Sequence, residues 1–148
     1  MTVSLYIECW HEAAKHKWIE SQKHGTDLGD EALHDWFSRH WPIYCRIGRL
    51  EHLAGIRAWT EFPMDDFNLI THLQAQGDNE TIDWILERAW QGLENLNLIN
   101  DAHEWALPID RVIEILGALH LNLAQLDPPM SRPAPQRFAT PRTLQSGD

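Results

Sequence analysis

Cysteine, basic residues and long hydrophobic runs are all scarce in this chain of 148 residues. Two cysteines, Cys9 and Cys45, are too few for a small disulfide-stapled scaffold, and we expect both to be buried and reduced. No apolar run approaches the roughly 20 residues that a membrane-spanning helix needs, and we find no signal-peptide pattern at the N-terminus. These absences lead us to expect a cytoplasmic protein that does not enter a membrane.

Basic residues are scarcest in the second half of the chain. Residues 61–127 contain 2 Lys or Arg and 13 Asp or Glu, whereas residues 1–60 contain 7 Lys or Arg and 8 Asp or Glu. A surface of this charge repels phosphates, which disfavours direct binding to nucleic acid or to an anionic membrane. Such a surface would suit binding to a basic protein partner. A further alternative is that the chain is an acidic mimic of nucleic acid and inhibits a basic partner.

Several motifs that carry common chemistries are also missing. The sequence has no Gly-rich phosphate loop, no Gly-x-Ser-x-Gly nucleophile turn and no Cys–His pair at a family-specific spacing. We therefore predict no catalytic residues and a protein that is not an enzyme.

What the chain does have is helical periodicity along most of its length, with no alternation typical of strands. Its 43% of hydrophobic residues and eight tryptophans can bury a sizeable core. We predict an all-α domain over residues 1–127, a compact bundle of six or seven helices. A flexible, Pro-rich tail is predicted over residues 128–148, where apolar residues are few.

The first predicted helix runs from about Val3 to His24 and ends at Gly25, a residue type that caps helices in the left-handed conformation. The other predicted helices lie near 30–41, 43–59, 63–76, 79–96, 101–105 and 108–126. Spacing predicts that the following residues of the first, second and third helices face the core: Ile7, Trp10, His11, Ala14, Trp18, Leu33, Trp36, Phe37, Ile43, Ile47, Leu50 and Leu53.

A Glu-x-x-His spacing, which dinuclear metal bundles use, occurs twice in the predicted first two helices. The candidate ligands of a divalent transition metal are Glu8, His11, Glu31 and His34. In projection Glu8 lies about 60° from His11, and His40 fits the apolar face of its helix better than His34 does. A metal-binding protein is therefore the alternative, and the preferred interpretation is histidines that form hydrogen bonds beside an aromatic core, with no cofactor.

One stretch near the C-terminus, DAHEWALPIDRVIEILGALHL, has the spacing of two short packed helices, with Ala106 where such pairs usually place glycine. Residues 99–126 resemble a helix-turn-helix module, in particular the small helical N-terminal module of bacterial translation initiation factor 2. A DNA-reading helix would present Arg, Lys, Asn or Gln to base edges. The polar positions here are Asp110, Arg111, Glu114 and His120, so a protein-facing or structural pair is predicted.

A second stretch, residues 18–41, resembles small uncharacterised bacterial helical proteins, and no family covers the whole chain. Tryptophan is enriched at interface hot spots, and eight tryptophans exceed what one small core usually needs. The leading prediction is a non-enzymatic bacterial adaptor or small regulator that binds another protein, and a homodimer is compatible with it. The predicted surface is Trp36, Trp41, Trp59, Trp84 and Trp90 with Asp65 and Asp66 of the acidic half.

Overall fold

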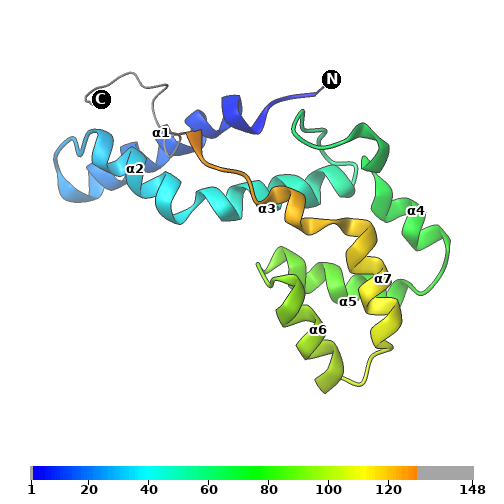
Figure 1. Cartoon of the computed structure of the whole chain (residues 1–148). Helices are drawn as coiled ribbons and strands as arrows, with labels where there is room; N and C mark the ends of the chain where they lie inside the picture. Colours follow the sequence, from blue (N-terminus) through cyan, green and yellow to red (C-terminus); the bar gives the residue numbers. More distant parts are fainter. Residues whose placement is uncertain (1, 130–148) are drawn as a thin grey trace, which may run out of the picture. The chain divides into compact units, whose positions relative to one another are not determined.

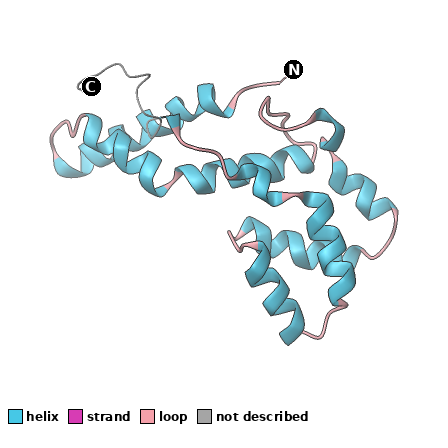
Figure 2. Cartoon of the chain, in the orientation of Figure 1, coloured by secondary structure: helices cyan, strands magenta, loops and turns pink. Residues whose placement is uncertain are grey.

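The computed structural model describes residues 2–129 of the chain. In this range the regular structure is helical, apart from one isolated bridge between Val3 and Trp59, and Figure 2 draws no strand there. The prediction of an all-α protein is confirmed. The predicted tail lies outside the described residues from residue 130 onward.

Seven α-helices and two short 3-10 helices follow one another along the described residues (Figure 1). They are α1 (Leu5–His24), α2 (Asp30–Arg39), α3 (Trp41–Leu53), η1 (Met64–Asp66), α4 (Leu69–Ala75), α5 (Asn79–Trp90), α6 (Asn95–Glu104), α7 (Ile109–Leu119) and η2 (Leu121–Ala124). Among the described helices, none combines the length and the apolar character needed to cross a bilayer.

Contacts along the chain divide it into two compact units. Among the described residues, unit 1 contains 2–9 and 42–125 and unit 2 contains 10–41 and 126–129, so that α1 and α3 each contribute to both. The predicted single domain over residues 1–127 stays a prediction.

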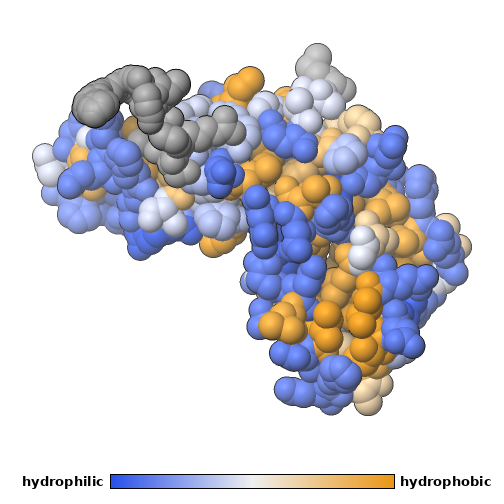
Figure 3. Space-filling model, in the orientation of Figure 1, coloured by the Kyte–Doolittle hydropathy of each residue, from blue (hydrophilic) through white to orange (hydrophobic). Residues whose placement is uncertain are grey.

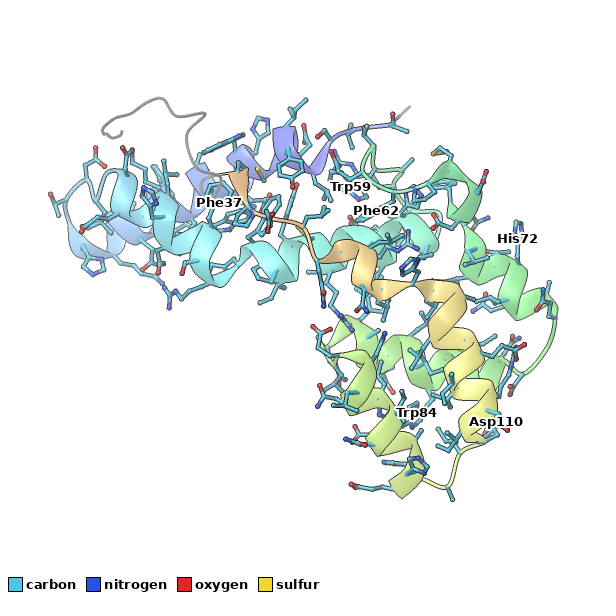
Figure 4. All side chains as sticks on the ribbon, in the orientation of Figure 1. Phe37, Trp59, Phe62, His72, Trp84 and Asp110 are labelled. Atoms are coloured by element: carbon cyan, nitrogen blue, oxygen red, sulfur yellow. The ribbon has the colours of Figure 1, made fainter. Side chains whose placement is uncertain are left out.

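Unit 2 is built on a helical hairpin, in which the part of α1 after Cys9 runs antiparallel to α2 (Figure 1). Gly25 and Gly29 bound the turn with φ of +72° and +64°, values that an L side chain rarely adopts. The aromatic core of the hairpin includes Phe37, labelled in Figure 4, whose ring packs edge-on against Trp36 with centroids 5.0 Å apart. The buried Trp36 and Phe37 agree with the sequence prediction.

The predicted inward stripe of α1 is wrong. Its members Ile7, Trp10, His11, Ala14 and Trp18 are exposed, and Trp18 leaves 65% of its surface in solvent. The buried positions are instead Leu5, Cys9 and Ala13, on a face roughly opposite. Small side chains let a neighbouring helix approach closely, a packing advantage that a count of hydrophobic residues does not register.

Unit 1 is organised by a core that α3 through η2 share. Its buried members, which include one or more residues from each of these α-helices, are Leu50, Leu53, Ile70, Leu73, Ile82, Ile85, Leu86, Ala89, Leu98, Ala102, Val112, Ile115, Leu116, Leu119 and Leu121. The helix predicted over residues 79–96 ends at Trp90, because Gly92 turns the chain with φ of +98°. Leu96, the last residue of that predicted range, is an exposed residue of α6.

The turn between α6 and α7 lies at Ala106, the position at which the sequence spacing predicts it. Ala106 has φ of +58°, the left-handed conformation that such turns need and that glycine adopts most easily. Its N–H donates to His103 O, and the next N–H, of Leu107, donates to Ala102 O at 2.9 Å. These two bonds form a Schellman motif, which closes α6 and directs the chain into α7.

Candidate functional site

The most unusual surface of unit 1 is a cleft between α3 and the end of α5. Ile43 and Ile47 of α3 are 55% and 38% exposed, and Trp90 of α5 is 41% exposed. With Arg46 and Glu94 these side chains line a hollow of about 150 Å³. The prediction that Ile43 and Ile47 face the core is therefore wrong, whereas Trp90 is an exposed aromatic residue at a concave surface.

Arg46 explains why α3 turns its isoleucines outward. The residue is 8% exposed, and its guanidinium donates to the carbonyl oxygens of Ala89 and Leu93, with Glu94 Oε2 3.2 Å from Nη1. Ala89 O lies in the last turn of α5, where the backbone carbonyls carry partial negative charge, and Leu93 lies just beyond that turn, so a cation is stabilised there. Since Arg46 must face α5 to reach these acceptors, Ile43 and Ile47 are left on a side of α3 that is open to solvent.

Arg49, one turn further along α3, is fully buried. Its Nη2 donates to Asp66 Oδ2 and to Leu119 O, each at 2.8 Å, while Nε and Nη1 have no hydrogen-bond partner. Phe62, labelled in Figure 4, places its ring centroid 5.2 Å from Cζ of this guanidinium. The charge is thus balanced by one carboxylate and one aromatic face.

His52 completes this buried network with a defined tautomer. Its Nδ1 accepts the N–H of Trp59 at 3.0 Å, so the proton of the neutral ring is on Nε2. That Nε2 lies 2.8 Å from Pro63 O and 3.1 Å from Asp66 Oδ1. We assign the hydrogen bond to the carbonyl, because the carboxylate oxygen does not meet hydrogen-bond geometry. The hydrogen bonds of Arg49 and His52 join α3 to Trp59, Pro63, Asp66 and Leu119, which indicates a structural network.

The residues predicted to form an interaction surface do not form one patch. Trp36, Trp41 and Trp59 are buried, and Trp41 Nε1 donates to Leu126 O. Asp65 is exposed, whereas Asp66 belongs to the buried network described above. Trp90 lies at the cleft, and Trp84 is half-buried on another face of α5.

Trp84, labelled in Figure 4, is part of a small cation–aromatic stack. Cζ of Arg88 lies 4.0 Å from the Trp84 ring centroid and 5.2 Å from that of Trp105. Figure 3 shows apolar surface, in orange, among hydrophilic residues over α6 and α7, where Leu96, Trp105 and Ile113 are exposed.

The predicted metal ligands do not assemble. Glu8 pairs with Arg57, with Oε1 3.3 Å from Nη2, and His11, Glu31 and His34 are exposed. Among residues 2–129 no three His, Cys, Asp or Glu side chains come together in a way that could hold a metal ion. The nearest contact of this kind pairs His16 Nε2 with Asp35 Oδ2 at 2.9 Å, and Arg39 shares that oxygen.

A larger hollow of about 580 Å³ lies on unit 2, along α1 and the turn that follows it. Trp18 is its large apolar wall, and Lys17 and Asp27 approach to 3.8 Å across it. Every lining residue is exposed or half-exposed, so the hollow offers a ligand neither enclosure nor a fixed polar partner. The smaller cleft, with its buried guanidinium, is the better-formed site.

The sequence alone could have suggested the cleft only through Trp90, since its other walls come from residues predicted to be buried. Comparison of the chain with protein-family models, with curated proteins and with solved structures finds no match. The resemblances of residues 99–126 and 18–41 therefore remain likenesses of short segments.

Proposed function

We propose that this chain is a non-enzymatic interaction protein, an adaptor or small bacterial regulator, whose cleft receives an apolar side chain of a protein partner. The observation that carries the proposal is the exposure of Ile43, Ile47 and Trp90 around one concavity. Apolar side chains gathered on a rigid concave surface are typical of interaction sites, and tryptophan is among the residues most enriched at binding hot spots.

The size of the cleft favours a protein partner over a small-molecule ligand. Sites for drug-sized ligands usually enclose about 300–1,000 Å³, whereas this cleft encloses about 150 Å³. Such a volume suits one or two inserted side chains. The rest of the interface would then lie on the surrounding surface of α3 and α5.

The floor of the cleft is fixed before any partner binds. Arg46 joins α3 to Ala89, Leu93 and Glu94, so the two helices that form the walls are held together by one buried side chain. A surface that is already ordered loses less conformational entropy on association. This preorganisation supports binding through the cleft.

The test is a comparative capture experiment with three full-length baits in the cells that express the chain. They are the wild type, the cleft variant I43S/I47S and the matched variant I7S/I113S, which removes two isoleucines exposed elsewhere. We expect a partner that the wild type and the matched variant retain and the cleft variant loses by at least tenfold, measured by quantitative mass spectrometry. Equal capture by all three baits, or no protein above the blank, would contradict the proposal.

A further inference from the structure

One side of α5 carries a row of carboxylates that leads into the cleft. At 100° per residue, Glu80, Asp83 and Glu87 lie within an arc of about 80° that also contains Trp90. All four side chains are exposed. We call these four residues the acidic stripe, which extends about 15 Å along the helix at 1.5 Å per residue.

The charges of the stripe are largely uncompensated. Within the described part of the chain Glu80 and Asp83 take part in no ion pair, and Asp83 accepts only a 3.5 Å contact from Gln74 Nε2. Glu87 Oε1 lies 3.6 Å from Arg88 Nη1, but that arginine is held over the ring of Trp84. By contrast, Asp78 and Glu114 of the same unit are both paired with Arg111.

We infer that the partner is a basic amphipathic helix, which lies along α5 with Lys or Arg facing the carboxylates and an apolar side chain in the cleft. This inference rests on the proposed function of the cleft and names the chemistry of its occupant. Complementary charge would select and orient the partner, while the apolar anchor would supply most of the affinity.

The spacing of the stripe indicates a helix rather than an extended segment. Its members are separated by three, four and three residues, which corresponds to steps of about 4.5, 6 and 4.5 Å along α5. A helix packed alongside repeats the same spacing on its own surface, so each carboxylate can face one basic side chain. Same-face residues of an extended chain recur every 6.5 Å or so and lose this register.

The experiment uses a displayed library of single helices as the probe. Exposed positions are drawn equally from Lys, Glu and Gln, and the anchor positions from Leu, Ile, Phe and Trp. Clones are selected on the wild-type chain alone, and each selected clone is then tested for binding to I43S/I47S. Affinities of the selected peptides are then measured by fluorescence anisotropy at 50 and 300 mM salt.

We expect selected clones to carry an excess of Lys at helical spacing beside one anchor. The variant E80Q/D83N/E87Q should weaken their binding about tenfold at 50 mM salt, as three partly screened ion pairs allow. The matched variant E31Q/D65N/E104Q, which removes three exposed carboxylates elsewhere, should change it less than twofold. Circular dichroism of each variant checks that the fold is retained.

The remaining outcomes overturn the inference in distinguishable ways. Clones rich in Gln or Glu that still need Ile43 and Ile47 would refute the basic partner and leave the proposed cleft standing. Basic clones that bind I43S/I47S equally well would show attraction by charge alone, with no role for the cleft. Absence of enrichment would refute the helical partner, while the capture experiment decides the proposed function separately.

Discussion

Helices α3 and α7 of unit 1 bury their residues by opposite rules. In α7 the buried side chains are Val112, Ile115, Leu116 and Leu119, and the charged residues face outward. In α3 the guanidiniums of Arg46 and Arg49 and the ring of His52 are buried, while Ile43 and Ile47 are exposed. The contrast shows that hydrophobicity alone does not decide which face of a helix turns inward.

In α3 the face that turns inward is decided by hydrogen-bond acceptors in distant parts of the chain. Arg46 is bound by carbonyls that lie about 45 residues later, and Arg49 by Asp66 and Leu119. A buried cation without such partners would cost several kcal/mol, whereas one that is paired is tolerated. Helix α7 needs no such help, because burying its aliphatic residues is favourable by itself.

The largest effect is expected from removing the counter-charge of α3. Asp66→Ala leaves the Arg49 guanidinium buried without its carboxylate and should lower the free energy of unfolding by about 3–5 kcal/mol. Its exposed neighbour is the control, because Asp65→Ala should cost less than about 0.5 kcal/mol. Urea denaturation measures both variants, and R49M/D66A should recover part of the loss. Equal stability of the two aspartate variants would contradict the role given to Asp66.

Helix α7 should respond to loss of volume instead of loss of charge. Ile115→Ala removes a fully buried side chain and should cost about 2–5 kcal/mol, since a cavity remains. Ile113→Ala, two residues earlier on the exposed face, should cost less than about 0.5 kcal/mol. The same denaturation measurement separates them, and similar costs would mean that α7 is not oriented as described.

The buried thiol of Cys45 on α3 should make the stability of the chain depend on pH above pH 9. Desolvation, with smaller contributions from Cys9 and Glu61, raises the pKa of Cys45 from 9.0 to about 12. Burial likewise raises the pKa of Cys9 to about 11. A raised folded-state pKa gives stability that is complete below pH 9 and is lost as the pH rises toward the folded value. Each thiol should thus contribute a fall of about 1.4 kcal/mol per pH unit above pH 9.

Comparison of the wild type with Cys45→Ala isolates this contribution. Between pH 9.5 and 10.5 the variant should lose stability about 1.4 kcal/mol per pH unit less steeply. Contributions that are common to both proteins cancel in the difference. Parallel pH profiles from urea denaturation would show that Cys45 ionises as readily in the folded chain as in the unfolded one.

A substitution in the turn before α7 should increase the stability of the chain. Ala106→Gly relieves a left-handed alanine and should raise the free energy of unfolding by about 0.5–1 kcal/mol, after the entropy of the unfolded glycine is subtracted. Ala118→Gly, at an ordinary helical position of α7, should lower it by a similar amount. Melting temperatures that move in the same direction for both variants would contradict the assigned turn.

The smallest effect is expected at the cleft. Ile47→Ser should change the free energy of unfolding by less than about 0.5 kcal/mol, because its side chain is already in contact with solvent. Leu50→Ala, less than one turn away on the buried face, should cost about 3 kcal/mol. A large loss in Ile47→Ser would mean that the cleft is part of the core and not a free surface.

Much of the fold could be predicted from local patterns. Helical periodicity gave the all-α class, spacing located the turn at Ala106, and the two cysteines are buried and unpaired as expected. These features depend on neighbours within a few residues. The faces of α1 and α3 could not be predicted in this way, because small buried side chains and distant carbonyl acceptors decide them.

The cleft was beyond prediction for the same reason. Its walls are hydrophobic residues that any periodicity argument assigns to a core, and its floor is an arginine that such an argument assigns to the surface. Only Trp90 of the predicted surface lies there, while Trp36, Trp41 and Trp59 fill the interior. Residue type alone therefore did not distinguish the exposed tryptophans from the buried ones.

The Arg46 contacts also fix when this surface can exist during synthesis. A chain that has emerged from the ribosome only through α4 carries Ile43 and Ile47 but neither the carbonyls of Ala89 and Leu93 nor Trp90. Its unpaired guanidinium would favour a solvent-facing α3, so the walls of the cleft would not yet be set. The surface proposed to receive a partner is therefore complete only once the chain is available through Glu94.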